Sequence, residues 1–280
     1  MGRSDGVRVK NVPSYRRIMP FFMKTKTDSM IQYSLDLKAD KLLEFAERMK
    51  KEYGRKVTLT HLVLHSLFKT HYAYPEVNRF IKAKVLWQRK GVWLSFSIKK
   101  EFNTKASLSI VKREFKEDFT LLDTIKAATK DTKEGRDTKK KDQAEKESNL
   151  YLWIPNFVKS LLFPGYMFFD EHGLFPRSYI EKDPLYASAF LANVGAFNAD
   201  TGYHHLYELG TITTFVVMGK IKKMPVVEDD EIVIRSIIPF KASADERICD
   251  GYYYYQALDY FRDQLENPER LLEPAEQVDK

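Results

Sequence analysis

Near its C-terminus the chain reads Asp245-Glu246-Arg247-Ile248-Cys249-Asp250-Gly251. Four consecutive tyrosines follow at residues 252–255, and a helix-like segment then runs to the pair Asn267-Pro268. Because the residue before a proline disfavours helical backbone, we predict a helix from Gly251 to about Glu266. An acidic loop that carries a glycine therefore leads directly into the closing helix of the chain.

Upstream of this loop, strand and helix patterns alternate. Residues 30–37 alternate between apolar and polar side chains, which is the period of a half-buried strand. Residues 40–53 and 58–74 have helical spacing and are ended by Gly54 and Pro75. Further strands are predicted at 84–89, 91–99, 106–113, 187–193, 211–220 and 231–240. We expect the two helices to pack on a sheet, and the three strands between 84 and 113 to form a meander.

Two central segments have an unusual composition. Residues 130–148 are charged and almost free of apolar side chains, so we expect a flexible segment, either a mobile loop or an exposed helix end. Residues 150–169 are very apolar, but Pro155 and Pro164 interrupt them well short of the roughly 20 residues of a bilayer span. We expect this apolar insertion to be a buried or interfacial hairpin, in the core or at a subunit contact. Peripheral membrane contact is the alternative.

The composition narrows the possible classes of protein. With 280 residues, 44% of them apolar, the chain can bury the core of one domain that spans 1–280. The net charge of +7 comes from scattered lysine-dense stretches, so we expect no nucleic-acid partner. A lone Cys249 excludes internal disulfides, and His61 and His65 lack a third metal ligand, so we expect no metal. Without an apolar leader at the N-terminus, a cytoplasmic protein is expected.

The segment 245–251 resembles the His-x-x-x-Asp-Gly signature of CoA-dependent acyltransferases, with Glu246 in the place of the histidine. This superfamily includes chloramphenicol acetyltransferase and the dihydrolipoamide acyltransferase core of 2-oxo acid dehydrogenase complexes. Other blocks resemble the family in the same order: the opening helix at 15–23, the long helix and its Pro-Glu-Leu-Asn ending at 57–78, the Ser-Asn-Leu-Gly turn at 190–195, the next strand at 214–225 and the C-terminal ending at 265–269.

The resemblance implies an α/β fold in which a mixed sheet is flanked by helices, as in chloramphenicol acetyltransferase. It also implies a homotrimer whose active sites lie between subunits, with CoA or acyl-CoA as substrate. Arg16 takes the place of an arginine that pairs with the motif aspartate, here Asp250, which precedes Gly251. The acyl acceptor is then a small molecule or a separate lipoyl protein. The chain shows no lipoyl domain or Pro/Ala-rich linker, so we do not expect a complete dehydrogenase-complex subunit.

Both positions that carry the family's chemistry are substituted. Transfer from a thioester needs a base and a donor to the oxyanion, and here Glu246 replaces the histidine and Ala192 replaces the serine. A carboxylate of ordinary pKa matches a thiol worse than an imidazole does, by about 3 kcal/mol, although burial beside Asp250 would narrow that gap. Losing one oxyanion donor typically costs about 10²- to 10³-fold in turnover.

Two interpretations of these substitutions remain open. In the first, Glu246 is a substitute base, helped by Asn193 of the turn and by His204 or His205, of which at most one should point into the channel if they lie on a strand. In the second, Glu246 is a surface or salt-bridged carboxylate of a retired site. The leading hypothesis is therefore an acyltransferase-family protein with altered or lost activity. The alternative is a non-catalytic trimeric scaffold or regulator that binds a protein partner or a membrane surface.

Overall fold

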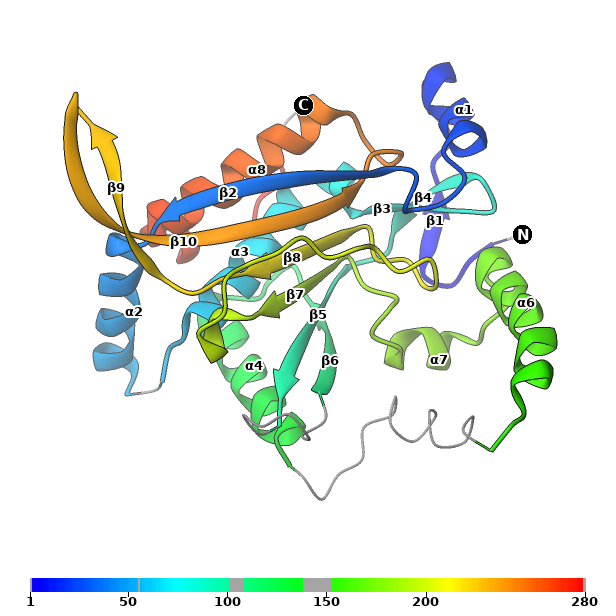
Figure 1. Ribbon diagram of the computed structural model, residues 1–280, viewed down its shortest axis with the longest axis horizontal. Coiled ribbons are helices and arrows are strands. Elements are labelled where there is room, and N and C mark those ends of the chain that lie inside the picture. The colour runs from blue at the N-terminus through cyan, green and yellow to red at the C-terminus, as the bar shows by residue number, and fades with distance from the viewer. Residues whose placement is uncertain (1, 55, 101–107, 138–152, 279–280) are drawn as a thin grey trace.

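The computed structural model describes residues 2–54, 56–100, 108–137 and 153–278. They form a seven-stranded mixed sheet and a small three-stranded sheet, with helices around them (Figure 1). The strands are β1 Gly6–Arg8, β2 Met30–Lys38, β3 Arg79–Lys82, β4 Val85–Arg89, β5 Val92–Lys99, β6 Leu108–Phe115, β7 Ala189–Asn193, β8 Thr214–Met218, β9 Lys222–Glu228 and β10 Glu231–Asp245. The helices are α1 Ser14–Phe22, α2 Asp40–Tyr53, α3 Leu59–Ala73, α4 Leu121–Gly135, α6 Asn156–His172, α7 Arg177–Lys182 and α8 Gly251–Glu266, with 3₁₀ turns at Pro75–Asn78, Gly195–Phe197 and Pro268–Leu271.

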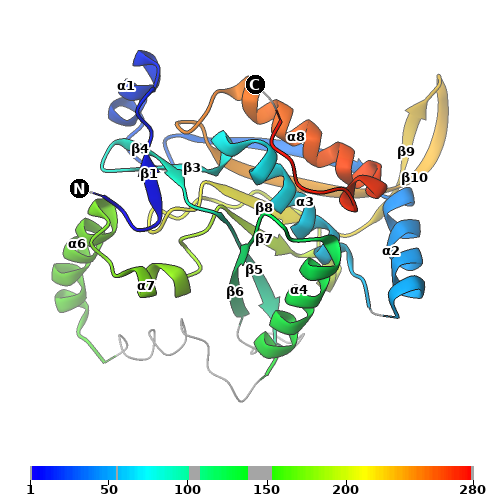
Figure 2. The same ribbon diagram turned by 180° about the vertical axis from the view of Figure 1, so that it is seen from behind.

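The large sheet has the strand order β2-β10-β8-β7-β5-β6, and β9 pairs with the first half of β10. Strands β5, β7 and β8 are parallel to one another, whereas β10 runs antiparallel to β8 and β2. The hairpin β9–β10 extends beyond the body of the molecule, and α1 and α6 lie at the opposite edge (Figures 1 and 2). The mixed α/β fold expected from the sequence is confirmed.

The core lies between one face of the large sheet and helices α2, α3, α4 and α8 (Figure 2). Helix α3 contacts the other three helices and the sheet, so its side chains are buried on nearly every side. Its first turn is closed by a capping box, in which Thr58 and His61 each accept from the other's backbone N–H. The predicted helices 40–53, 58–74 and 251–266 are confirmed within a residue.

The strand predictions are correct in place but not always in pairing. Strand β4 does not form a meander with β5, because it pairs with β1 and β3 in the small sheet, while β5 pairs with β6 and β7. Alternating apolar and polar residues predict where a strand lies, but they do not predict which other strand it pairs with. Strand β9 was not predicted, and β10 runs five residues beyond the predicted end at 240.

The hairpin predicted for 150–169 is wrong, because residues 156–172 form the single helix α6 with Pro164 inside it. Most of its large apolar side chains are exposed in the protomer, and none joins the core. The charged segment 130–148 begins as the last turn of α4, which was one of the two alternatives left open. Its residues 138–148, like residues 150–152, lie outside the described part of the chain.

Candidate functional site

The loop between β10 and α8 is held by a buried ion pair that the sequence motif did not reveal. Asp245 and Arg247 are both buried, and the guanidinium meets the carboxylate through two hydrogen bonds of 2.9 and 2.8 Å. Burial disfavours the charge of Arg247, but the bonds and charge of Asp245 outweigh it and raise the pKa of Arg247. Ser29 Oγ donates to Asp245, and Arg247 donates to the Met23 carbonyl. The loop is therefore tied to the segment before β2.

Glu246 lies between the two members of this pair with its backbone fixed and its side chain half-buried. Its N–H donates to the Ser29 carbonyl at 2.9 Å, and its carbonyl accepts from Arg16 at 3.2 Å. In the described part of the chain its carboxylate accepts no hydrogen bond, and Arg247 is engaged with Asp245 instead. Burial, with the charges of Cys249 and Glu246 in support, raises the pKa of Tyr33 to about 12. Since it accepts no hydrogen bond within the described protomer, the Glu246 carboxylate is free to contact a substrate or another chain.

The expected pairing of Arg16 with Asp250 is not what the structure shows. The buried Arg16 donates to the carbonyls of Glu246 and Arg247. Asp250 is exposed and caps α8, its carboxylate accepting from the Tyr253 N–H at 2.9 Å. Gly251 then begins the helix. Both motif residues thus shape the loop, as expected, but each does so through backbone groups. Cys249 is fully buried, and burial raises the pKa of its thiol.

Ala192 and Asn193 lie at the C-terminal end of β7 and face opposite sides of the sheet. Asn193 points to the helical side, where its amide donates to Thr60 Oγ1 at 2.9 Å and accepts from the Ala196 N–H at 3.0 Å. One of its two N–H groups is therefore already used inside the protomer. Ala192 faces the other side and packs beside the cluster formed by Phe190 and Phe215.

His204 and His205 lie in an irregular segment, so the strand geometry that would turn them to opposite faces does not apply. The half-buried His204 stacks on Phe215 with ring centroids 3.9 Å apart, while His205 is exposed. Phe215 is in register with Phe190, two residues before Ala192. His204 therefore lies on the same face of the sheet as Ala192, one strand away and about two residues back along the strands.

Within one protomer Glu246 and Ala192 cannot meet. Ala192 is opposite Val217, which is opposite Lys241 on β10. Glu246 follows Lys241 by five residues, so it lies roughly 16 Å farther along the strands, and roughly 10 Å across them. The two substituted positions therefore sit at opposite ends of the sheet.

A cleft of about 550 Å³ opens at the C-terminal ends of the parallel strands β5 and β7. Its walls come from α4, from the N-terminus of α3 and from the turn after Asn193. Its basic residues are Lys56, Lys99, Lys133 and Arg136, and the buried His61 also lines it. In the described part of the chain no carboxylate pairs with Lys56, Lys133 or Arg136. Ligands of open α/β sheets commonly bind at such strand ends, and a helix N-terminus with nearby cations favours an anion.

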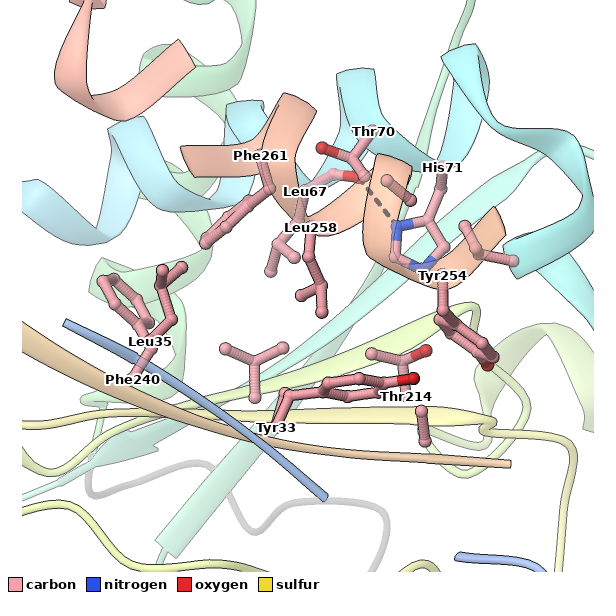
Figure 3. Close-up of a pocket in the computed structure, with 15 residues that line it drawn as sticks. Tyr33, Leu35, Leu67, Thr70, His71, Thr214, Phe240, Tyr254, Leu258 and Phe261 are labelled. Carbon is pink, nitrogen blue, oxygen red and sulfur yellow. Dashed lines mark hydrogen bonds between the residues drawn. The ribbon is translucent and has the colours of Figure 1, made fainter. Parts of the chain in front are cut away.

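A second cavity, of about 50 Å³, lies inside the core between the sheet and helices α3 and α8. Figure 3 shows the His71 ring and Tyr254 beside it, among apolar side chains that include Leu35 and Phe261. His71 Nδ1 lies 2.8 Å from the Leu67 carbonyl, but its Nε2 has no hydrogen-bond partner in the described structure. This cavity is lined by apolar core side chains and is far smaller than the basic cleft, so it does not resemble a catalytic cleft.

Nothing in the described residues forms a metal centre, since no three His, Cys, Asp or Glu side chains gather there as ligands. His61 and His65 are buried on α3. The basic cleft was not found from the sequence, because its residues come from five separate segments. The lysines were visible in the sequence, but only the fold brings them together.

The fold and part of the sequence match known acyltransferases. Residues 187–273, which include Ala192 and Glu246, match the family model of the 2-oxoacid dehydrogenases acyltransferase (catalytic domain). A search of curated proteins finds no match. The match to the family model confirms the resemblance that the sequence blocks suggested.

Solved structures share the fold at low identity. The Azotobacter vinelandii dihydrolipoamide acetyltransferase, studied for the roles of a serine, a histidine and an asparagine in its mechanism, matches with TM-score 0.63 and 15% identity over 95% of this chain and 94% of its own. A probable dihydrolipoamide acetyltransferase from Listeria monocytogenes matches with TM-score 0.60 and 13% identity over 93% and 95%. A chloramphenicol acetyltransferase matches with TM-score 0.53 and 12% identity over 96% and 100%.

Proposed function

We propose that this protein, which has the fold of a CoA-dependent acyltransferase, binds CoA or an acyl-CoA in a channel formed between the subunits of a homotrimer. Glu246 of one protomer then meets the Ala192 end of its neighbour's sheet. The separation of these positions within one chain supports the proposal, because only a second copy can bring them together. Such a closed ring places the same two surfaces at every interface.

The basic cleft beside Asn193 is the observation that carries the proposal. CoA is a phosphate-bearing ligand, and an anion of this kind is favoured where lysines, an arginine and a helix N-terminus converge. Lys56 lies just before α3, and Lys133 and Arg136 lie at the end of α4, all without carboxylate partners in the described structure. A ligand anchored there would reach along the strand ends toward Ala192.

The chemistry that this arrangement supports is acyl transfer with a carboxylate base. Glu246 takes the proton from a thiol, hydroxyl or amine, whose heteroatom attacks the thioester carbonyl carbon. The carbon–sulfur bond breaks, and the CoA thiolate takes up the proton. His204, which stacks on the same face of the sheet as Ala192, replaces the absent serine as a donor. The acceptor is a small molecule or a separate lipoyl protein in the cytoplasm.

The second candidate function is a non-catalytic scaffold or regulator. The exposed apolar side chains of α6 favour it, since they suit a docking surface better than a catalytic domain. The two functions differ in whether an acyl-CoA binds the basic cleft.

Thermal unfolding with acetyl-CoA tests the proposal. A ligand at 100 times its dissociation constant should stabilise the protein by about 2.7 kcal/mol. The double variant Lys56→Glu/Lys133→Glu should lose this shift, because it reverses two of the charges that face the phosphates. Lys10→Glu/Lys116→Glu is the matched control, since both of these exposed lysines lie outside the cleft. The absence of any shift, or an equal shift in both double variants, would refute acyl-CoA binding in this cleft.

A further inference from the structure

Helix α6 is fixed to the protein through its two acidic residues, Asp170 and Glu171. Asp170 is 0% exposed and receives hydrogen bonds from the Lys82 ammonium at 2.6 Å and from Tyr186 Oη at 2.7 Å. The Gly210 N–H donates to the same carboxylate, and Glu171 also pairs with Lys82. These contacts come from β3 and from two separate loops. They fix both the position of the helix and its rotation about its axis.

The opposite side of α6 is apolar and faces outward. Phe157 and Leu161 are 77% and 79% exposed, and the other large members of this face are exposed as well. They are Leu162, Phe168 and Phe169. At 100° per residue these positions fall on one arc of the helix, and that arc carries no charged residue. An ordinary surface helix has the reverse arrangement, so α6 presents its apolar face for contact with something else.

The buried ion pair keeps the apolar arc on the outside. Rotating α6 to bury Phe157 and Leu161 would pull Asp170 away from Lys82 and leave a buried ammonium without its counter-charge. The exposed arc is therefore a stable feature of the fold. Trp153, just before the helix, continues the exposed aromatic surface.

Helix α1 adds a second apolar surface at the same edge of the molecule, opposite the β9–β10 hairpin (Figures 1 and 2). Its residues Ile18, Phe21 and Phe22 are exposed. The ammonium of Lys84 lies 4.6 Å from the centre of the Phe21 ring. An aromatic side chain beside an amine suits a boundary between hydrocarbon and phosphate.

The charges around these apolar surfaces are mostly positive. Near the tip of α1 the exposed Arg17, Lys24 and Lys84 outnumber the exposed Asp28, and the half-buried Lys159 lies on α6. On α6 both acidic residues, Asp170 and Glu171, are already bound to Lys82. A second copy docked here by twofold symmetry would place cations against cations, whereas an anionic surface would neutralise them.

We propose that α6 and the tip of α1 dock the protein on an anionic lipid bilayer, with their outward aromatic and leucine side chains in the headgroup region. No helix among the described residues is long and apolar enough to span a membrane, so the contact is peripheral. The cations at the rim bind the lipid phosphates. This inference is independent of acyl-CoA binding, since α6 does not line the basic cleft.

Sedimentation with lipid vesicles tests the docking surface. The full chain should bind vesicles of phosphatidylcholine and phosphatidylglycerol, more weakly as salt is added and more weakly to phosphatidylcholine alone. Phe157→Asp/Leu161→Asp should lower the binding at least about tenfold, because two charges replace apolar anchors. Acidic residues suit the first turns of a helix, so α6 should still form. Ile232→Asp on β10, where the parent side chain is also 77% exposed, is the matched control and should bind like the parent.

Two outcomes would overturn the proposal: no vesicle binding by the parent, or equal binding by the parent and the α6 variant. If the parent binds no vesicles and the α6 variant changes its oligomeric mass, the arc belongs to a contact with a second copy. Equal binding to neutral and anionic vesicles would overturn the anionic part of the proposal. The acetyl-CoA shift of the α6 variant should match that of the parent, which separates this test from that of the proposed function.

Discussion

His71 lies in the middle of the core with one ring nitrogen facing the small apolar cavity. Burial is the main reason that its pKa falls to about 4, and the same cause lowers the pKa of His61 to about 4 and that of His65 to about 3. All three are therefore neutral in the folded protein over most of the range in which an exposed histidine titrates. The three residues give α3 a specific sensitivity to acid.

We expect the protein to lose stability as the pH falls from about 6.5 toward about 4, because the unfolded chain binds protons there that the folded chain does not. The contribution of each neutral histidine is complete above about pH 6.5. For His71 the loss by pH 5 is about 2 kcal/mol. Urea unfolding of His71→Leu should therefore show about 2 kcal/mol less acid sensitivity than the parent. His205→Gln is the control, and equal pH dependence in His71→Leu and the parent would contradict the expectation.

At the residue scale, the sequence located the loop 245–251 but not the bonds that hold it. The motif predicted that Arg16 and Asp250 would meet, and both do support the loop, yet through its carbonyl and N–H groups. The Asp245–Arg247 pair was not foreseen, because nothing in an i, i+2 spacing distinguishes a buried pair from two surface charges. Burial is a property of the whole fold, so it decides such roles.

Among the elements, α6 depends most on one interaction. Its Asp170 is buried with the Lys82 ammonium, whereas the nearby pair Arg177–Glu181 on α7 is largely exposed. A buried pair contributes little net stability, but each partner is costly to leave alone in a low dielectric. The exposed pair is hydrated and contributes little.

Lys82→Met should destabilise the protein by about 3–5 kcal/mol, because it leaves the Asp170 carboxylate buried without its cation. Adding Asp170→Asn should recover part of this loss, since the amide is neutral and still accepts from Tyr186. Arg177→Met, which breaks the exposed pair, should cost no more than about 1 kcal/mol. Chemical denaturation measures all three. Equal losses for Lys82→Met and Arg177→Met would mean that the inner pair is hydrated.

At the element scale, the sequence predicted α2, α3 and α8 because caps and breakers mark their ends. It did not predict α6, because prolines at 155 and 164 look like breaks. The structure tolerates Pro155 as the residue before the helix and Pro164 as an exposed internal position. The outward apolar face could not be derived either, since orientation depends on Lys82, which lies 88 residues away in the sequence.

At the scale of the whole molecule, the strand directions separate the two substituted positions. Because β10 is antiparallel to β8 while β7 is parallel to it, the loop with Glu246 and the turn with Ala192 lie at opposite ends of the strands of one sheet. The basic cleft lies at the same end as Ala192. If a site needs all of these parts, each protomer holds two incomplete halves, one at each end of its strands.

Mixed assemblies test this division of the site. Glu246→Gln removes the base from one half, and Lys56→Glu/Lys133→Glu disables the cleft in the other, so each variant alone should release little CoA from acetyl-CoA with a thiol, amine or alcohol acceptor. In a cyclic trimer that contains both variants, one interface pairs an intact Glu246 with an intact cleft, so about one site in three should recover. Separately tagged, co-expressed chains would provide such trimers. If sites lay within a protomer, mixing would restore nothing, because every chain carries a defect. If the parent releases no CoA with any acceptor, the protein binds acyl-CoA without transferring the acyl group. The thermal shift with acetyl-CoA would then replace CoA release as the measurement in the mixed trimers.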